Sequence, residues 1–231
     1  DRRQRQMCIR DRDLLALYSF TGGVAKYVQL LVDAGATTKT KMLNHIIKAD
    51  SVFLGEGKAI LIEEFGKDYG VYFSILSAIA RGKTLRSEIE QEYEVITKNQ
   101  PIFEKSSTKN VRYTIEDNFF TFWFRFIYKY NYMLEIENFD AVKTIINRDY
   151  ETFSGKMLER YFKRVLMESK AYTRIGSWWD RRGENEIDIV AENELNDEAV
   201  FIEVKRKEDN FDAVALNEKV DVFTRATGKF K

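Results

Sequence analysis

The spacing of the apolar residues changes near residue 170, and this change constrains the fold more than any other feature. Before it, apolar side chains recur at intervals of three and four, as in Tyr27, Leu31 and Val32, which is typical of amphipathic helices. After it, residues 186–191 and 199–205 alternate in the manner of strands. We therefore predict that the last hundred residues run helix, three strands, helix, with the helices packed on a small sheet.

The same reading predicts elements along the whole chain. The expected helices are 38–49, 69–80, 142–153, 156–167 and 214–224, and the expected strands are 172–175, 186–191 and 199–205. The alternation of Val111, Tyr113 and Ile115 predicts a β-ribbon, after which Asp117 is expected to cap a very aromatic helix. The helical spacing of those aromatic residues favours a core position over stacking on unpaired bases.

Composition excludes several classes of protein. The 37 Lys and Arg residues balance the 37 Asp and Glu residues, so net charge alone indicates no partner. Cys8 is the only cysteine, which excludes a disulfide scaffold and suits a reducing compartment, so we expect a cytoplasmic protein. No apolar run approaches the roughly 20 residues that cross a bilayer, and we expect no membrane partner.

The opening segment, residues 1–12, contains five Arg and two Asp with almost no apolar content. We expect it to be a non-native segment, and we exclude it from the fold. Under the alternative interpretation it is a basic arm that binds nucleic acid.

The strongest chemical signal lies in the predicted strands 186–191 and 199–205. A hairpin whose turn is centred between residues 195 and 196 places Asp188 opposite Glu203, and Glu186 opposite Lys205. Facing carboxylates about 5 Å apart raise each other's pKa unless a cation lies between them. A Mg²⁺ or Mn²⁺ ion would relieve that repulsion, and Lys205 could orient a metal-bound water. Cross-strand salt bridges on an exposed sheet face explain the pattern equally well.

Basic and aromatic residues flank this pair of strands. Trp179, Arg181 and Arg182 are predicted in a turn beside the acidic face, where they could contact the backbone and bases of a nucleic acid. Arg206 belongs to a short basic cluster that could meet phosphates. The alternative for the tryptophan turn is a solvated loop anchored by one buried Trp.

Asp188, followed by Glu203-Val204-Lys205 in a hairpin and preceded by a helix that carries Glu159, resembles the PD-(D/E)XK nuclease-like superfamily. The core order of that superfamily is α-β-β-β-α-β. The resemblance implies that Asp188, Glu203 and Glu159 are metal ligands and that Lys205 is the catalytic lysine beside Asp188 and Glu203. It also implies that Glu186 is an accessory acid and that DNA is the substrate.

Five further segments look like the C-terminal half of archaeal-type ATPases, which carry a P-loop domain, a winged-helix segment and a nuclease-like domain. These are GGVAKY at 22–27, YFSILSAIARGKT at 72–84, RYTI at 112–115, FWFRF at 122–126 and GENEIDIV at 183–190. The resemblance implies a helical remnant of the ATPase lid at 13–66. A winged-helix-like segment would follow at 67–133, and a nuclease-like domain at 134–231.

Three departures from that family change the expectation. No Gly-x-x-x-x-Gly-Lys-[Ser/Thr] motif is present, so ATP binding and self-association are expected of an ATPase domain that precedes this chain. Too few residues follow 87–90 for a recognition helix, which is expected to be missing. The fourth strand of the nuclease-like sheet is expected beyond Lys231.

We therefore expect the chain to be a fragment of an ATPase-associated protein, an α+β or α/β multidomain protein. Its nuclease-like domain would hydrolyse DNA phosphodiesters with a bound metal ion. The alternatives are a nucleic-acid-binding or regulatory module without turnover, attached to an AAA-type ATP-binding protein, and a lid that tunes a neighbouring ATPase.

Overall fold

The computed structural model of the chain describes residues 10–80, 96–105 and 110–230. The fold is a mixture of helices and small antiparallel sheets, as predicted. The chain forms two compact units: residues 1–97 with 114–154, and residues 98–113 with 155–231. Residues 87–90, after which the recognition helix is expected to be missing, lie outside the described residues, as do the last residues of the 72–84 segment.

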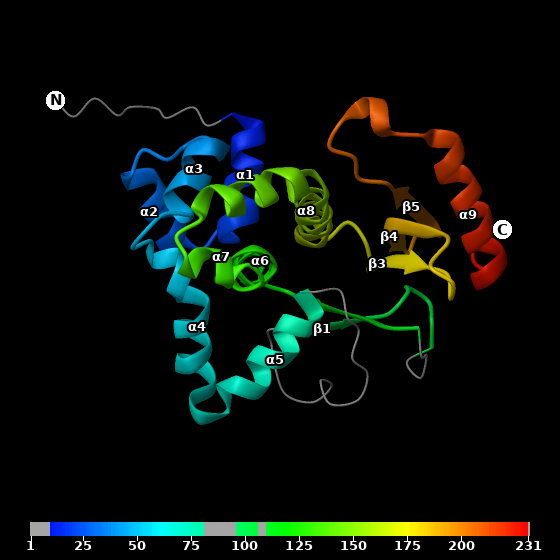
Figure 1. Ribbon diagram of the computed structural model, residues 1–231. Helices are drawn as coiled ribbons and strands as arrows, with labels where there is room; N and C mark the ends of the chain where they lie inside the picture. The colour runs from blue at the N-terminus through cyan, green and yellow to red at the C-terminus, as the bar shows by residue number, and fades with distance from the viewer. Residues whose placement is uncertain (1–9, 81–95, 106–109, 231) are drawn as a thin grey trace. The chain divides into compact units, whose positions relative to one another are not determined.

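The first unit is helical (Figure 1). Its elements are α1 (Asp11–Thr21), α2 (Ala25–Asp33), α3 (Lys39–Ile46), α4 (Val52–Phe65), the 3₁₀ turn Gly66–Asp68, α5 (Tyr69–Ala80), α6 (Asn118–Phe122), the π-helix η2 (Trp123–Tyr128) and α7 (Asn131–Glu135). Helix α1 includes Asp11 and Arg12, so the segment excluded from the fold was drawn two residues too long. Asp117 caps α6 as predicted, because its carboxylate accepts the N–H of Phe120 at 2.7 Å.

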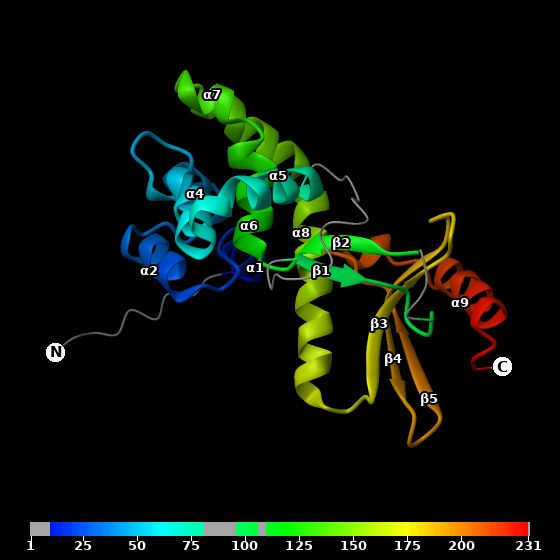
Figure 2. The ribbon, with the colours of Figure 1, turned by 90° about the horizontal axis from the view of Figure 1, so that it is seen from below.

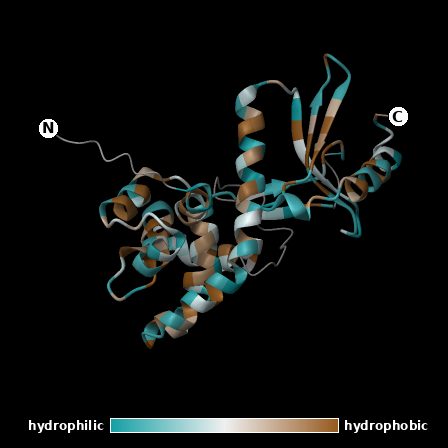
Figure 3. Cartoon of the chain, turned by 90° about the horizontal axis from the view of Figure 1, so that it is seen from above, coloured by the Kyte–Doolittle hydropathy of each residue, from teal (hydrophilic) through white to brown (hydrophobic). Residues whose placement is uncertain are grey.

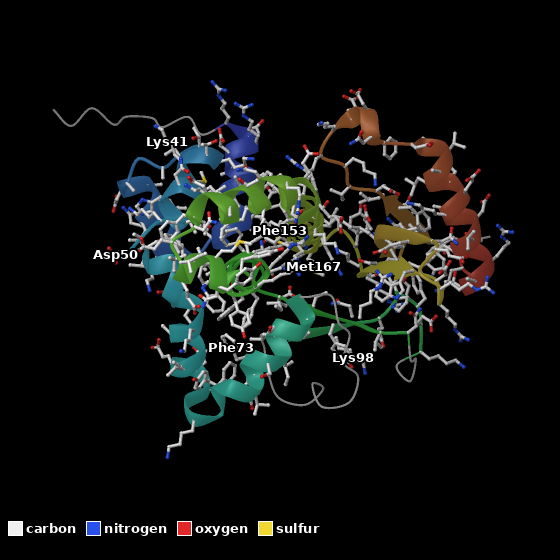
Figure 4. The ribbon with its side chains drawn as sticks, viewed as in Figure 1. Lys41, Asp50, Phe73, Lys98, Phe153 and Met167 are labelled. Atoms are coloured by element: carbon white, nitrogen blue, oxygen red, sulfur yellow. The ribbon has the colours of Figure 1, made fainter. Side chains whose placement is uncertain are left out.

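The aromatic helix forms the core of this first unit. The ring of Phe122 lies 4.9 Å from that of Phe20 and 6.0 Å from that of Phe153, and Phe126 lies 5.2 Å from Phe153. Figure 4 labels Phe153, the residue that Phe122 and Phe126 both contact, and Phe73, another residue of this unit. Phe20, Phe122 and Phe126 are fully buried. The prediction that these aromatic residues pack in a core rather than stack on bases is therefore confirmed.

Helix α8 (Phe139–Ser169) replaces the two helices predicted at 142–153 and 156–167. Those two predicted ranges leave Ser154 and Gly155 outside either helix. Instead, the Ser154 hydroxyl donates to the carbonyl of Tyr150 at 2.7 Å, and no atom crowds Gly155, so the helical turn continues through both. Figure 3 shows hydrophobic bands that recur along this helix, whose second half belongs to the C-terminal unit.

The C-terminal unit contains β3 (Arg174–Trp179), β4 (Glu186–Asn193), β5 (Glu198–Ile202), the 3₁₀ turn Glu208–Asn210 and α9 (Ala213–Thr227). The strands form one antiparallel sheet in the order β3-β4-β5. Ile189 pairs with Ile202 and Asn193 with Glu198, which confirms the predicted register of the hairpin. The second half of α8 and helix α9 lie on opposite sides of this sheet (Figures 1 and 2).

Two strand boundaries differ from the prediction. Strand β5 ends at Ile202, so Glu203 and Lys205 lie beyond the ladder. Strand β3 begins at Arg174 rather than at residue 172 and extends to Trp179, which moves both neighbouring tryptophans from the predicted turn into the sheet. The reason is packing: Trp178 joins a buried cluster with Ile187 and Phe223.

A β-ribbon of β1 (Ile96–Asn99) and β2 (Arg112–Ile115) confirms the predicted alternation. Residues 98–113 belong to the C-terminal unit, and the resemblance assigns them to the winged-helix-like segment at 67–133. The N–H of Ile102 donates to the carbonyl of Ser177 at 2.9 Å, at the bulge of β3. A Cβ at Gly176 would lie 2.9 Å from the Cβ of Ile102, so glycine permits this close approach. No helix among the described residues is long and apolar enough to cross a membrane.

Candidate functional site

Asp188 lies near the start of β4, at the end of the sheet where β5 finishes. Its Oδ2 accepts the N–H of Val204 at 2.8 Å, which holds the segment after β5 beside β4. Its Oδ1 accepts no hydrogen bond from the residues that the structure describes. Burial raises the pKa of Asp188; the Val204 N–H opposes that rise, and the charge of Glu203 adds to it.

Glu203 is held by two lysines. Lys205 donates to Oε1 at 2.6 Å, and Lys219, on α9, donates to Oε1 at 3.0 Å and to Oε2 at 2.8 Å. Burial by itself would raise the pKa of Glu203, but the hydrogen bonds from the two ammonium groups outweigh burial and lower it. The hydrogen bond from Glu203, in turn, raises the pKa of Lys205.

Glu159 comes from the second half of α8 and completes the acidic side of the site. Burial raises the pKa of Glu159 to about 7, with a further contribution from the charge of Asp188. Glu159 accepts no hydrogen bond from any residue in the described part of the chain. The structure thus brings Glu159, Asp188, Glu203 and Lys205 close enough for their charges to act on one another.

The fit of a metal ion to this group depends on the number of protein ligands required. Across the described ranges, no set of three or more His, Cys, Asp or Glu residues is arranged to hold a metal ion, and both oxygens of Glu203 accept hydrogen bonds from Lys219. Mg²⁺, however, usually binds through one or two carboxylates and keeps several waters. Asp188 and Glu159 are the two carboxylates to consider for that smaller requirement, because both are half-buried and because Oδ1 of Asp188 and both oxygens of Glu159 accept no hydrogen bond from described residues.

Glu186 does not face Lys205, in contrast to the predicted pairing. It pairs with Trp179 of β3, and its carboxylate forms an ion pair with Arg112 of the ribbon at 2.9 Å. The pairing fails because β5 ends three residues before Lys205, so the ladder does not extend that far. Glu186 still lies close enough for its charge to raise the pKa of Glu159 and of Asp188.

The residues predicted to contact nucleic acid divide into two groups. Trp179 is 5% exposed, its indole N–H donates to Asn110 at 2.9 Å, and Arg112 covers its ring, so it offers no open face for stacking. Trp178 is buried as well, so both tryptophans are anchors rather than one. Arg181 and Arg182 are exposed in the loop after β3, and Arg206 is half-buried.

Sequence reasoning missed Lys219 and Arg112. Both come from elements far along the chain from the residues they contact: Lys219 from α9, and Arg112 from the ribbon. In the sequence Lys219 is one charged residue on an amphipathic helix, and no spacing connects it to Glu203. Only the packing of α9 on the sheet brings the two together.

The two lysines at Glu203 lead to a prediction on stability. Lys219→Met should lower the free energy of unfolding by about 1 kcal/mol at pH 7, because Glu203 loses a partner on both oxygens. The lowered pKa of Glu203 stabilises the fold above the ordinary glutamate pKa, and this contribution disappears as the pH falls through the folded-state pKa. Urea unfolding should therefore show a difference at pH 7 that vanishes near pH 3. Lys219→Arg, the control, should stay near wild type.

Comparison with known proteins gives similarity to one family profile and to one curated protein. Residues 123–220 match the profile of DUF234, described as archaea bacterial proteins of unknown function. The matched range contains Glu159, Asp188, Glu203 and Lys205.

An uncharacterized protein of Methanocaldococcus jannaschii is 30% identical over 225 residues, which cover 85% of this chain and 48% of that protein. The chain thus spans about half the length of this curated relative. No solved structure matches the chain.

Proposed function

We propose that the C-terminal unit is a nuclease-like domain that binds the phosphodiester backbone of DNA and hydrolyses it with a bound Mg²⁺ or Mn²⁺ ion. One observation carries the proposal. Two half-buried carboxylates, Glu159 and Asp188, retain acceptor oxygens without described donors, and their charges interact with that of Lys205, which is paired with Glu203. Removing a charged carboxylate from water costs free energy unless the carboxylate binds a cation or takes up a proton.

In this proposal Asp188 and Glu159 hold the cation. When bound, the ion supplies Lewis-acid chemistry, lowering the pKa of a water and polarising a phosphoryl oxygen. The side chain of Lys205 is 35% exposed, so a bound substrate could contact its ammonium group. Lys219 would keep Glu203 in an ion pair meanwhile. Its ammonium would then orient the attacking water or offset charge that develops on the phosphate. Glu203 fixes the position of that lysine, and the Val204 N–H fixes Asp188.

Calorimetry with Mg²⁺ and Mn²⁺ tests the cation site. We expect the wild-type chain to bind one ion and Asp188→Ala to lose at least about tenfold in affinity, because one of two protein ligands is removed. Glu194→Ala is the matched control, since Glu194 is an exposed acid in the turn after β4. Cleavage of labelled duplex DNA should require the ion and stop in EDTA. Equal affinity in the wild type and in Asp188→Ala would refute the assignment.

A specific observation favours a second candidate function. Glu203 is already neutralised by two ammonium groups, so the unit can remain folded with its acidic group intact and without any turnover. Such a domain would be a nucleic-acid-binding or regulatory module attached to an AAA-type ATP-binding protein. DNA binding by the wild type without cleavage, at saturating Mg²⁺ and Mn²⁺, would support this second function over hydrolysis.

The wider resemblance extends the proposal to the whole protein. We propose a PD-(D/E)XK nuclease-like fold for the C-terminal unit, a winged-helix-like origin for the ribbon region, and a cytoplasmic location. ATP binding and self-association would belong to an ATPase domain elsewhere in the intact protein. The α-β-β-β-α order of the C-terminal unit supports the first of these assignments.

A further inference from the structure

We infer that the ribbon supplies a phosphate-binding residue, Arg112, to the C-terminal unit, and that Arg112 forms a basic rim with Arg181 and Arg182. This rim would bind the sugar-phosphate backbone of a nucleic acid at the end of the sheet that carries Asp188. The inference rests on the proposed function, because it names a contact through which the same site holds its substrate.

Arg112 is arranged as a preorganised anion-binding group. Its guanidinium carbon lies 4.4 Å from the centre of the Trp179 ring, and its NH1 pairs with Glu186 at 2.9 Å. These two contacts orient the side chain, which is nevertheless 37% exposed. A guanidinium has five N–H donors, and among the described residues only the Glu186 carboxylate accepts from this one. The remaining donors suit the oxygens of a phosphate.

The loop after β3 is held in a fixed shape that presents the other two arginines. Oδ1 of Asp180 accepts the N–H groups of Arg182 and Glu184 at 3.0 Å each, and Oδ2 accepts the backbone N–H of Asn185 at 3.1 Å and its side-chain amide at 2.7 Å. Gly183 adopts a φ of +71°, which favours glycine, so the turn closes without strain. Both Arg181 and Arg182 are exposed, and neither forms an ion pair with a described residue.

Arg112 and this loop are neighbours. A Cβ built at Gly183 would lie 3.9 Å from NH2 of Arg112, so the ribbon arginine lies against the loop that bears the other two. The loop joins β3 to β4 at the end of the sheet where Trp179 pairs with Glu186, two residues before Asp188.

Charge explains why such a rim is needed. A phosphodiester would be repelled by the neighbouring acids Glu159, Glu186 and Asp188. Arginine side chains held in place near these acids would offset that repulsion. Asp180 accepts its hydrogen bonds from the turn and Glu186 pairs with Arg112, so neither carboxylate forms an ion pair with Arg181 or Arg182. Contacts of this kind bind phosphates and do not depend on sequence.

Fluorescence anisotropy of a labelled 20-base-pair duplex, in EDTA so that no cleavage occurs, tests the inference with the full chain. Arg112→Ala should weaken binding roughly threefold to tenfold and reduce the slope of log K against log salt concentration by about 1. Glu186→Gln should strengthen binding, because it releases Arg112 from its ion pair. Arg225→Ala, an exposed arginine of α9, is the charge-matched control and should leave binding unchanged.

Each outcome separates the inference from the function on which it rests. If the wild type binds DNA and Arg112→Ala and Arg225→Ala bind equally well, the rim is wrong while the proposed function stands. If the wild type binds no DNA at any salt concentration, the proposed function fails together with the rim. Arg112→Lys, which keeps the charge but loses the flat contact with Trp179, covers the case in which Arg112→Ala does not fold. It should bind more weakly than the wild type, and wild-type affinity in Arg112→Lys together with no gain in Glu186→Gln would overturn the inference.

Discussion

Gly57→Ala should destabilise the chain by about 3 kcal/mol, a large fraction of the stability of an ordinary domain. Gly57 lies in α4, where a Cβ would come within 2.3 Å of Cδ2 of Trp123. Trp123 has little freedom to move away, because its indole N–H donates to the carbonyl of Leu54 at 3.1 Å and its ring stacks on Tyr128. The added methyl group must therefore push the helix and the π-helix apart.

Gly55→Ala provides a control in the same helix. Nothing lies within 4 Å of the position that its Cβ would take, so only helix propensity changes. We expect a neutral or slightly stabilising effect of about 0.5–1 kcal/mol. Thermal unfolding followed by circular dichroism measures both variants. Similar melting temperatures for Gly57→Ala and Gly55→Ala would show that α4 does not pack on Trp123 this closely.

Glu159→Gln should raise stability at alkaline pH. The pKa of Glu159 is about 7 in the folded chain against an ordinary value of 4.5, so the folded state keeps a proton that the unfolded state releases. The free energy of unfolding then falls as the pH rises from 4.5 to 7, and the lost stability is not recovered above that range. Glutamine carries no charge and avoids this loss. At pH 8 the variant should be about 3 kcal/mol more stable than the wild type.

Urea unfolding at pH 4.5 and at pH 8, in EDTA, measures this difference. The two proteins should agree at the lower pH and diverge at the higher one. Saturating Mg²⁺ at pH 8 should then stabilise the wild type more than Glu159→Gln, because the ion replaces the proton at this carboxylate. A constant difference between the two proteins across the pH range would show that Glu159 titrates normally.

Local patterns were sufficient for much of the fold. The switch of period near residue 170 predicted the order of the C-terminal elements, and the position of the turn after β4 predicted the register that pairs Ile189 with Ile202. The Asp117 cap was also predictable, because capping needs only a residue and the three that follow it. The ends of helices were less predictable. Two helices were predicted on either side of Ser154 and Gly155, but α8 continues through both residues.

The amino-acid sequence by itself determined the secondary structure and the residue types of the candidate site, because both depend on contacts between near neighbours and on one hairpin. The tertiary structure alone decided the electrostatics. Lys219 reaches Glu203 from α9, Arg112 reaches Glu186 from a ribbon more than seventy residues earlier, and the charge of Asp188 acts on the half-buried Glu159 of α8. Charges act through space, and spacing along a chain carries no signal for partners that only packing brings together.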